Sequence, residues 1–203
     1  ESGRYLLMLI NEILDLAQIE SGNVGVDLEP VAVNRLLENV FTLLRPVAEK
    51  DNIRLSVSEK EDHECFVLAD KLRLKQVLLN LVSNAVKYNK QNGFVNASFQ
   101  EERRGYLRIT IHDTGSGVPE KLQHLLFEPF ERLGREGGDI RGAGVGLNIT
   151  KRLIQLMDGS IGYKSSPGTG SSFYVELPVC APPAQRENKP STEIKATPVH
   201  DKH

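Results

Sequence analysis

Apolar residues recur along this chain with two periods, one typical of helices and the other typical of strands. A spacing of three or four residues predicts amphipathic helices. The clearest of these helices spans residues 33–50, and others are expected at 4–21, after Asp70, at 120–126 and at 147–157. Asp70 can accept hydrogen bonds from the free N–H groups of the helix that follows it, and Gly159 is expected to cap the last helix.

Strict alternation of apolar and polar residues predicts strands. The expected strands are residues 24–28, 53–57, 65–69, 94–100, 106–112, 160–164 and 171–177. Glu29 and Pro30 should end the first strand, because proline cannot donate to a strand ladder. The runs at 94–100 and 106–112 are expected to form an antiparallel pair. Strands and helices in this mixture predict an α/β domain.

The composition adds bounds on size and on partners. The 203 residues are enough for one medium domain with an accessory element, and the net charge of −2 gives no reason to expect nucleic acid as a partner. Cys65 and Cys180 lack the spacing of metal ligands and are expected to be reduced thiols of a cytosolic protein. No apolar run is long enough to predict a transmembrane helix.

The two ends of the chain differ from its middle. Residues 4–21 carry apolar positions with a 4-3-4 spacing, which predicts a coiled-coil seam, so we expect residues 1–22 to end a dimerisation hairpin. An ordinary helix packed on its own domain is the alternative. The chain begins inside this pattern and without Met, which indicates a fragment whose parent can be membrane-anchored. Residues 180–203 are polar and Pro-rich and predict a disordered tail or linker, which leaves 23–179 as the main domain.

Asp113 follows the alternating run 106–112 and falls on its apolar, core-facing side. A buried carboxylate needs hydrogen bonds, and its donor is either a backbone group of the protein or an amine of a ligand. Gly115 and Gly117 come next, and glycine permits positive φ angles and close approach of the backbone. Two glycines directly after a buried carboxylate favour the ligand.

A second group of glycines precedes the last predicted helix at every other position. They are Gly142, Gly144 and Gly146. Glycines before a helix leave backbone N–H groups free to bind phosphate at the positive end of the helix dipole. The preceding residues, 133–143, are polar and Gly-rich and are expected to form a mobile cover. Arg132 and Arg141 can reach a phosphate chain from this region.

Four polar side chains share one face of the helix that follows Asp70. They are Gln76, Asn80, Asn84 and Lys87, spaced 4-4-3. Asparagine is a poor helix former, and exposed helical positions favour other residues. Amide oxygens suit Mg²⁺, which takes oxygen ligands and retains several waters. The stripe therefore favours amide oxygens of Asn80 and Asn84 directed at a cation such as Mg²⁺, or at ordered water, over a solvated flank.

Residues 4–178 resemble the end of the phosphoacceptor hairpin and the ATP-binding catalytic domain of sensor histidine kinases, which belong to the GHKL superfamily with the Bergerat fold. Four sequence boxes carry this resemblance, in the family's order. They are the N box at 80–88 (NLVSNAVKY), the G1 box at 113–117 (DTGSG), the F box at 127–130 (FEPF) and the G2 box at 142–147 (GAGVGL). The turn at 168–170 resembles the family's later glycine turn.

The resemblance implies a two-layer sandwich, in which a mixed sheet of about five strands carries three helices on one face, preceded by the coiled-coil-like helix. It also implies binding of ATP with Mg²⁺ and transfer of the γ-phosphoryl group to a histidine. The implied catalytic residues are Asn80, Lys87 and Arg132, and the implied magnesium ligands are Asn80 and Asn84. The implied nucleotide contacts are Asn84, Tyr88, Asp113, Gly115, Gly117, Val118, Phe130, Arg141, Gly142, Gly144, Val145, Gly146, Leu147 and Thr169.

Partners are also implied by the resemblance. They are the phosphoacceptor hairpin of the full-length chain, within a homodimer, and the receiver domain of a response regulator. The resemblance also implies that this domain lies in the cytoplasm. The family's acceptor histidine has no counterpart, because His63 and Glu64 have the dipeptide but precede a predicted strand. This chain by itself is therefore not expected to phosphorylate itself.

Other functions stay open at this point. Ala143 stands where relatives often carry a hydroxyl or an amide, which leaves a degenerate kinase acting as a non-catalytic scaffold as an alternative. A gyrase-like or chaperone-like hydrolase is disfavoured, because those enzymes place a water-activating Glu where this chain has Asn80, and an amide cannot accept the proton. A protein serine kinase of the same superfamily is a third option.

Overall fold

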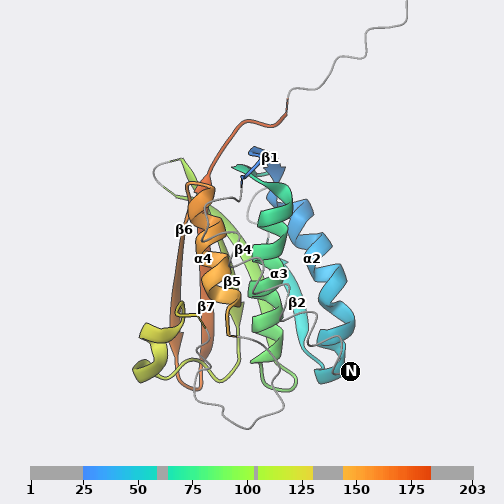
Figure 1. The fold of residues 1–203 in the computed structure, drawn as a ribbon. Helices are drawn as coiled ribbons and strands as arrows, with labels where there is room; N and C mark the ends of the chain where they lie inside the picture. Colours follow the sequence, from blue (N-terminus) through green and yellow to red (C-terminus); the bar gives the residue numbers. More distant parts are fainter. Residues whose placement is uncertain (1–24, 59–63, 103–104, 130–143, 184–203) are drawn as a thin grey trace, which may run out of the picture.

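The computed structural model describes residues 25–58, 64–102, 105–129 and 144–183. One five-stranded sheet forms a layer, and three helices cover the same face of it (Figure 1). The helices are α2 Val33–Ala48, α3 Lys71–Lys87 and α4 Gly146–Leu156, with short 3₁₀ helices η1 Glu49–Asp51 and η2 Glu120–Leu125. The predicted two-layer α/β sandwich is confirmed, whereas the predicted helix at 4–21 lies outside the described residues.

The sheet is mixed, as predicted. Its strands are β2 Arg54–Ser58, β4 Phe94–Glu102, β5 Tyr106–Asp113, β6 Ser160–Ser166 and β7 Gly170–Pro178, in the spatial order β2-β4-β5-β7-β6. The strand β2 runs parallel to β4, and every other neighbouring pair is antiparallel. Since β5 is the central strand, its last residue lies between β4 and β7 at one end of the sheet.

The predicted strand at 24–28 is wrong. The strand in this region, β1, is Glu29–Ala32, and it pairs antiparallel with β3, Phe66–Ala69, in a separate two-stranded sheet. Pro30 is tolerated because, among the described residues, β1 pairs with β3 alone, and on an edge strand a missing N–H need not break a ladder. Cys180, placed in the tail by its sequence, donates its backbone N–H to the carbonyl oxygen of Phe66 at 3.0 Å.

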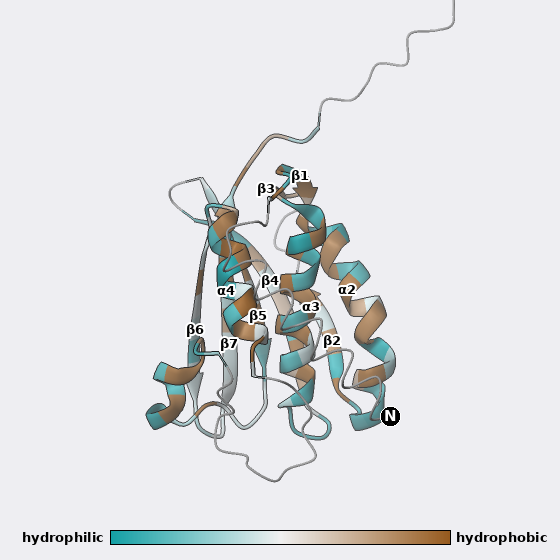
Figure 2. Cartoon of the chain, viewed as in Figure 1, coloured by the Kyte–Doolittle hydropathy of each residue, from teal (hydrophilic) through white to brown (hydrophobic). Residues whose placement is uncertain are grey.

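The apolar faces of the helices pack against one face of the sheet. Figure 2 shows hydrophobic and hydrophilic residues alternating along α2, α3 and α4, as expected for helices with one buried side. Among the largest fully buried side chains are Leu37, Leu74, Leu78, Leu81, Ile109, Ile111 and Leu153. The predicted cap is confirmed, since the Asp70 carboxylate accepts from the backbone N–H groups of Leu72 and Arg73.

The end of α4 differs in detail from the prediction. Asp158, with φ of 55°, is the left-handed residue that turns the chain, and Gly159 follows it. The N–H of Gly159 still donates to the carbonyl oxygen of Ile154 at 2.9 Å. Gly159 is needed for another reason, because a Cβ there would lie closer than 3.0 Å to the carbonyl oxygen of Glu176 on β7.

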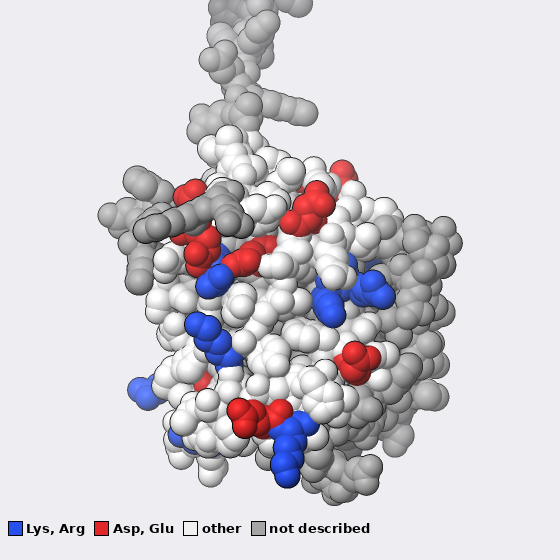
Figure 3. All heavy atoms as spheres, turned by 90° about the vertical axis from the view of Figure 1, so that its left-hand side faces the viewer, with Lys and Arg blue, Asp and Glu red and all other residues white. Residues whose placement is uncertain are grey.

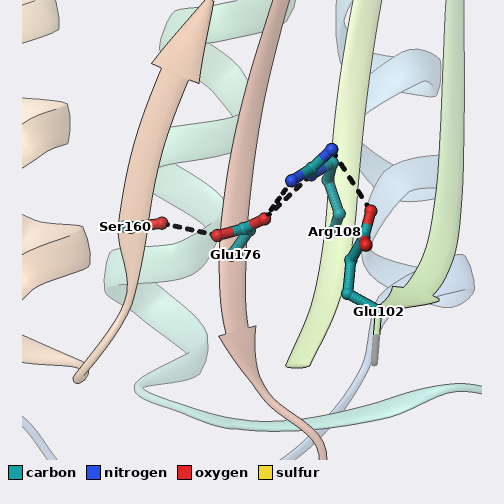
Figure 4. Close-up of polar contacts among 4 residues, drawn as sticks. All are labelled: Glu102, Arg108, Ser160 and Glu176. Carbon is teal, nitrogen blue, oxygen red and sulfur yellow. Dashed lines mark hydrogen bonds and ion pairs between the residues drawn. The ribbon is translucent and has the colours of Figure 1, made fainter. Parts of the chain in front are cut away.

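The face of the sheet opposite the helices carries an ionic network centred on Arg108 of β5. Its guanidinium donates to Glu176 on β7 and pairs with Glu102 on β4, while Ser160 on β6 donates to the second oxygen of Glu176 (Figure 4). The ring of Tyr174 lies 4.5 Å from the Arg108 guanidinium carbon. The network therefore links four neighbouring strands on the open face.

We expect Glu176→Gln to make the stability of the domain less dependent on acid pH. Hydrogen bonds from Arg108 and then Ser160 hold the pKa of Glu176 below its ordinary value of 4.5. A lowered pKa in the folded state adds stability above the unfolded pKa, and this stability is lost as the pH falls through the folded pKa. At pH 7 the free energy of unfolding of the wild type should exceed that of the variant by about 1 kcal/mol. The difference is small because the ion pair is partly exposed.

Urea unfolding at pH 7 and near pH 3 measures this difference. The gap between wild type and variant should close at the lower pH. Glu101→Gln on the exposed part of β4 is the control and should show no comparable change. A Glu176→Gln deficit of the same size at both pH values would contradict the assignment.

Candidate functional site

Asp113 ends β5 on the core-facing side, as its place in the alternation predicts, and is 5% exposed. Its Oδ1 accepts the backbone N–H of Gly115 at 2.8 Å. Burial raises the pKa of this carboxyl, against the effect of hydrogen bonds from the Gly115 and Ser171 backbones. The protein thus supplies internal donors, but a carboxylate has about four lone-pair sites, so an amine of a ligand can still be accepted.

The glycines after Asp113 are needed where the turn meets other parts of the chain. A Cβ on Gly115 would lie closer than 3.0 Å to the carbonyl oxygen of Tyr88, which ends α3. Gly117 has φ of +67°, and its Cβ would meet the carbonyl oxygen of Ser166 on β6 equally closely. Both glycines therefore lie against the protein's own backbone, and the approach to a ligand that the sequence favours stays a prediction.

The stripe of amides on α3 faces the first turn of α4. The Nδ2 of Asn80 donates to the Oγ1 of Thr150 at 2.8 Å, and the Nδ2 of Asn84 lies 3.4 Å from the Oδ1 of Asn80. Gly146 opens α4 at this point, and a Cβ on it would be 2.5 Å from the Oδ1 of Asn80. Gly146 and Asn80, 66 residues apart in sequence, thus meet.

Short backbone contacts connect these amides to the carboxylate. The N–H of Tyr88 donates to the carbonyl oxygen of Asn84 at 2.9 Å, and the carbonyl oxygen of Tyr88 accepts the N–H of Ser116 at 3.4 Å. In Figure 1 the end of α3, the start of α4 and the end of β5 all lie toward the lower part of the molecule. Asp113, Asn84 and Asn80 therefore belong to one region and not to separate faces.

A cation and an aromatic ring lie beside this region at the end of α3. The Nζ of Lys87 is 5.0 Å from the ring centroid of Tyr88, and Tyr88 is 44% exposed. A lysine held over a ring keeps its charge at the surface. Positive charge and an exposed ring thus lie close to Asn84 in the chain.

The remaining described residues of the predicted set lie in the adjoining turns. The N–H of Val118 donates to the Oγ of Ser165 at 2.8 Å, and the Oγ1 of Thr169 donates to the carbonyl oxygen of Ser166 at 3.0 Å. Gly144, Val145 and Leu147 form the entry to α4. Phe130, Arg132, Arg141 and Gly142 lie outside the described residues, and so does the predicted cover at 133–143.

Two residues of α4 that the sequence reading missed take part in the region. Thr150 is 1% exposed and holds Asn80. The Nδ2 of Asn148 donates to the carbonyl oxygen of Phe127 at 2.9 Å, which ties the segment after η2 to α4. A threonine on the buried side of an amphipathic helix is the signal that would have identified Thr150, because buried hydroxyls need partners.

The donor set fits a magnesium ion. No three His, Cys, Asp or Glu side chains come together to hold a metal anywhere in the described ranges. Asn80 and Asn84 instead provide neutral amide oxygens one helical turn apart. Mg²⁺ bound mainly by phosphate oxygens and water needs only one or two protein ligands, which these amides can provide.

The surface carries mixed charge on the face that Figure 3 shows, where Lys and Arg side chains are interspersed with Asp and Glu. In the part of the chain that the structure describes, no helix combines the length and the apolar character that crossing a bilayer requires.

Residues 69–181 match the model of a protein family described as "Histidine kinase-, DNA gyrase B-, and HSP90-like ATPase". The chain is 38% identical over 196 residues to the sensor protein GacS of Pseudomonas syringae pv. syringae, covering 93% of the chain and 21% of GacS. It is 38% identical over 184 residues to the circadian input-output histidine kinase CikA of Synechococcus elongatus, covering 88% of the chain and 24% of CikA. The chain spans about a fifth of the length of the two GacS relatives.

Solved structures show the same fold. Full-length ShkA in complex with AMPPNP superposes with a TM-score of 0.81 and 33% identity, over 91% of this chain and 38% of ShkA. Histidine kinase ThkA in complex with the response regulator protein TrrA gives a TM-score of 0.63 and 25% identity, over 86% of this chain and 50% of that one.

Proposed function

This chain belongs to the histidine kinase-, DNA gyrase B- and HSP90-like ATPases, among which its relatives are sensor histidine kinases, and we propose that it binds Mg-ATP for phosphoryl transfer. The acceptor is a histidine on a dimerisation domain, and the process is two-component signal transduction. The observation that carries the proposal is the convergence of Asp113, Asn84 and Asn80 on one region beside the start of α4.

The proposed roles follow from the chemistry of each group. Asp113 accepts the exocyclic amine of adenine, which selects ATP. Asn80 and Asn84 hold Mg²⁺, directly or through water, and the ion would neutralise phosphate charge. Lys87 adds positive charge beside them, and Tyr88 packs over the nucleotide. Phosphoryl transfer needs mainly positioning and charge stabilisation, which these groups are suited to give.

The turns around these groups complete the proposed nucleotide site. Gly144 and Gly146, with Val145 and Leu147, present the N-terminal turn of α4 to the phosphates. Gly115, Gly117 and Val118 lie along the base, with Thr169 in the facing turn. The proposed contributions of Arg132, Arg141, Gly142 and Phe130 rest on the sequence alone.

Hydrolysis of ATP by water is the weaker alternative. A hydrolase of this superfamily needs a carboxylate base in the place of Asn80, and an amide cannot take up a proton from water. The Nδ2 of Asn80 is moreover engaged with Thr150 at 2.8 Å. A transferase therefore fits this arrangement better than a hydrolase does.

The proposed partners are the phosphoacceptor hairpin of the full-length homodimer and a response regulator. Support for the second partner comes from ThkA, whose solved complex contains the response regulator protein TrrA. Residues 23–179 are proposed as the catalytic unit, with the hairpin end at 1–22 and the tail at 180–203.

We expect Asn84→Ala to remove most of the dependence of nucleotide binding on Mg²⁺. The variant deletes an amide oxygen one turn from Asn80, so the ion would lose a protein ligand. Calorimetry with AMPPNP, with and without Mg²⁺, measures the effect. Affinity without Mg²⁺ should stay close to the wild type. Gln100→Ala at the exposed end of β4 is the control, and an unchanged Mg²⁺ response in Asn84→Ala would contradict the assignment.

The proposed reaction is tested by supplying the upstream helical hairpin of the parent protein in trans with ATP labelled on its γ-phosphate. Acid-labile, base-stable label on the hairpin is the expected result. The chain without the hairpin should remain unlabelled. Release of free phosphate with no labelled hairpin would favour the hydrolase, and binding without either product would favour the scaffold.

A further inference from the structure

Helix α4 holds the side-chain amide of Asn80 at two points, one helical turn apart. Gly146 and Thr150 lie at positions i and i+4 of α4 and so share one face of the helix. Gly146 leaves room for the Oδ1 of Asn80, since a Cβ there would be 2.5 Å from this oxygen. The Thr150 hydroxyl oxygen accepts a hydrogen bond from the Nδ2 of Asn80 at 2.8 Å.

This arrangement fixes the orientation of the Asn80 side-chain amide, with its oxygen and its nitrogen directed at different parts of α4. The first N–H groups of a helix have no partner within the helix and lie at the positive end of its dipole, which favours the oxygen of Asn80 on the side of the first turn of α4. The nitrogen then points further along α4 to the Thr150 hydroxyl. Asn84 adds a weaker contact, with its Nδ2 3.4 Å from the same oxygen.

The Thr150 hydroxyl is not an ordinary helix-surface group. It is 1% exposed and lies among Ile149, Leu153 and Ile154 on the buried side of α4. Valine has nearly the same shape and would fill this place without a polar atom. A buried hydroxyl that makes a 2.8 Å bond to a side chain of a different helix therefore indicates that orienting that side chain is its role.

We propose that Thr150 is a positioning residue that holds Asn80 with its amide oxygen toward the phosphate side of the site, and so sets the affinity for the nucleotide-bound divalent cation. The inference deepens the proposed function and rests on it. A metal ligand is commonly oriented by a second residue that binds its other polar atom. Without Thr150 the amide of Asn80 can rotate, and its nitrogen can replace its oxygen at the metal.

The matched pair Thr150→Val and Thr150→Ser tests the proposal. Valine keeps the shape and removes the acceptor, whereas serine keeps the acceptor. The measured quantity is the ratio of AMPPNP dissociation constants without and with Mg²⁺. We expect this ratio to fall by about tenfold in Thr150→Val, the lower end for loss of a residue that orients a metal ligand. Thr150→Ser should retain the wild-type ratio.

Three outcomes would overturn the proposal. They are a wild-type ratio in Thr150→Val, an equal loss in both variants, and an equal loss of affinity with and without Mg²⁺, which would show a purely structural role. Thr42→Val is the control, because the Thr42 hydroxyl donates to the Glu38 carbonyl on the exposed side of α2. A wild type without any Mg²⁺ response would instead refute the proposed function.

A second measurement needs no variant and no nucleotide. The side-chain amide protons of Asn80 should exchange with solvent at least tenfold more slowly than those of exposed Asn39, because the Thr150 bond protects them. Nuclear magnetic resonance on uniformly labelled protein reads both side chains. Equal exchange at Asn80 and Asn39 would overturn the proposal even if Thr150→Val failed to fold.

Discussion

Asp113→Asn should weaken ATP binding at least tenfold while leaving the nucleotide-free domain as stable as the wild type or more stable. The first effect follows because an amide presents a single acceptor oxygen and no charge to the adenine amine. Hydrogen bonds to charged groups contribute about 1.5–3 kcal/mol, which corresponds to roughly ten- to a hundredfold in affinity.

The effect on stability has the opposite sign. Burial raises the pKa of Asp113 above its ordinary value of 3.8, so the charged carboxylate destabilises the folded state at pH values above the folded pKa. This penalty disappears as the pH falls toward the unfolded pKa. Asparagine removes the charge and keeps an oxygen that can accept from Gly115. Any gain in stability should therefore be present at pH 7 and absent near pH 4.

Calorimetry with ATP and thermal unfolding without nucleotide measure the two effects separately. A purine nucleoside triphosphate that lacks the exocyclic amine is the control ligand and should bind wild type and variant with similar affinity. Unchanged ATP affinity would refute the adenine role. A large loss of stability in the nucleotide-free variant would show that the carboxylate has a structural role instead.

Gly117→Ala should destabilise the domain by about 2–5 kcal/mol, the sum of a left-handed backbone penalty of about 1–2 kcal/mol and a steric overlap of about 1–3 kcal/mol. Gly117 has φ of +67°, and a Cβ on it would lie closer than 3.0 Å to the carbonyl oxygen of Ser166. The oxygen belongs to the backbone and the Cβ is fixed rigidly to it, so neither atom can move away without displacing its strand or turn. Urea unfolding at pH 7 measures the loss.

Gly168→Ala provides a matched control for the steric part. Gly168 lies in the turn between β6 and β7 that meets the Asp113 turn, and its N–H donates to the Ser116 carbonyl oxygen at 2.7 Å. Its φ is +81°, but a Cβ there would have nothing within 4 Å. The free energy of unfolding of Gly168→Ala should fall by only about 1–2 kcal/mol. Equal losses in the two variants would show that the overlap at Gly117 contributes nothing.

Much of the architecture was predictable because it depends on local periodicity. The alternation in 106–112 placed Asp113 on the core side, and the spacing in α3 placed Asn80 and Asn84 on one face; the structure confirms both. The strand predicted at 24–28 was wrong because pairing with β3 decides where β1 lies. The run at 24–28 alternates well enough for a strand, but in the described part of the chain residues 25–28 pair with no strand.

Local order along the chain was enough to predict most of the elements and the inward carboxylate, because these follow from the period of apolar positions. It led to the interpretation of glycines 115, 117 and 146 as contacts for a ligand. The reason for each glycine came from folding. The atoms that exclude a Cβ belong to Tyr88, Ser166 and Asn80. Each of these residues is at least 27 positions away in sequence from the glycine that it contacts. The role of Thr150 likewise appears only when α4 packs on α3, since no local pattern states which side chain a buried hydroxyl will meet.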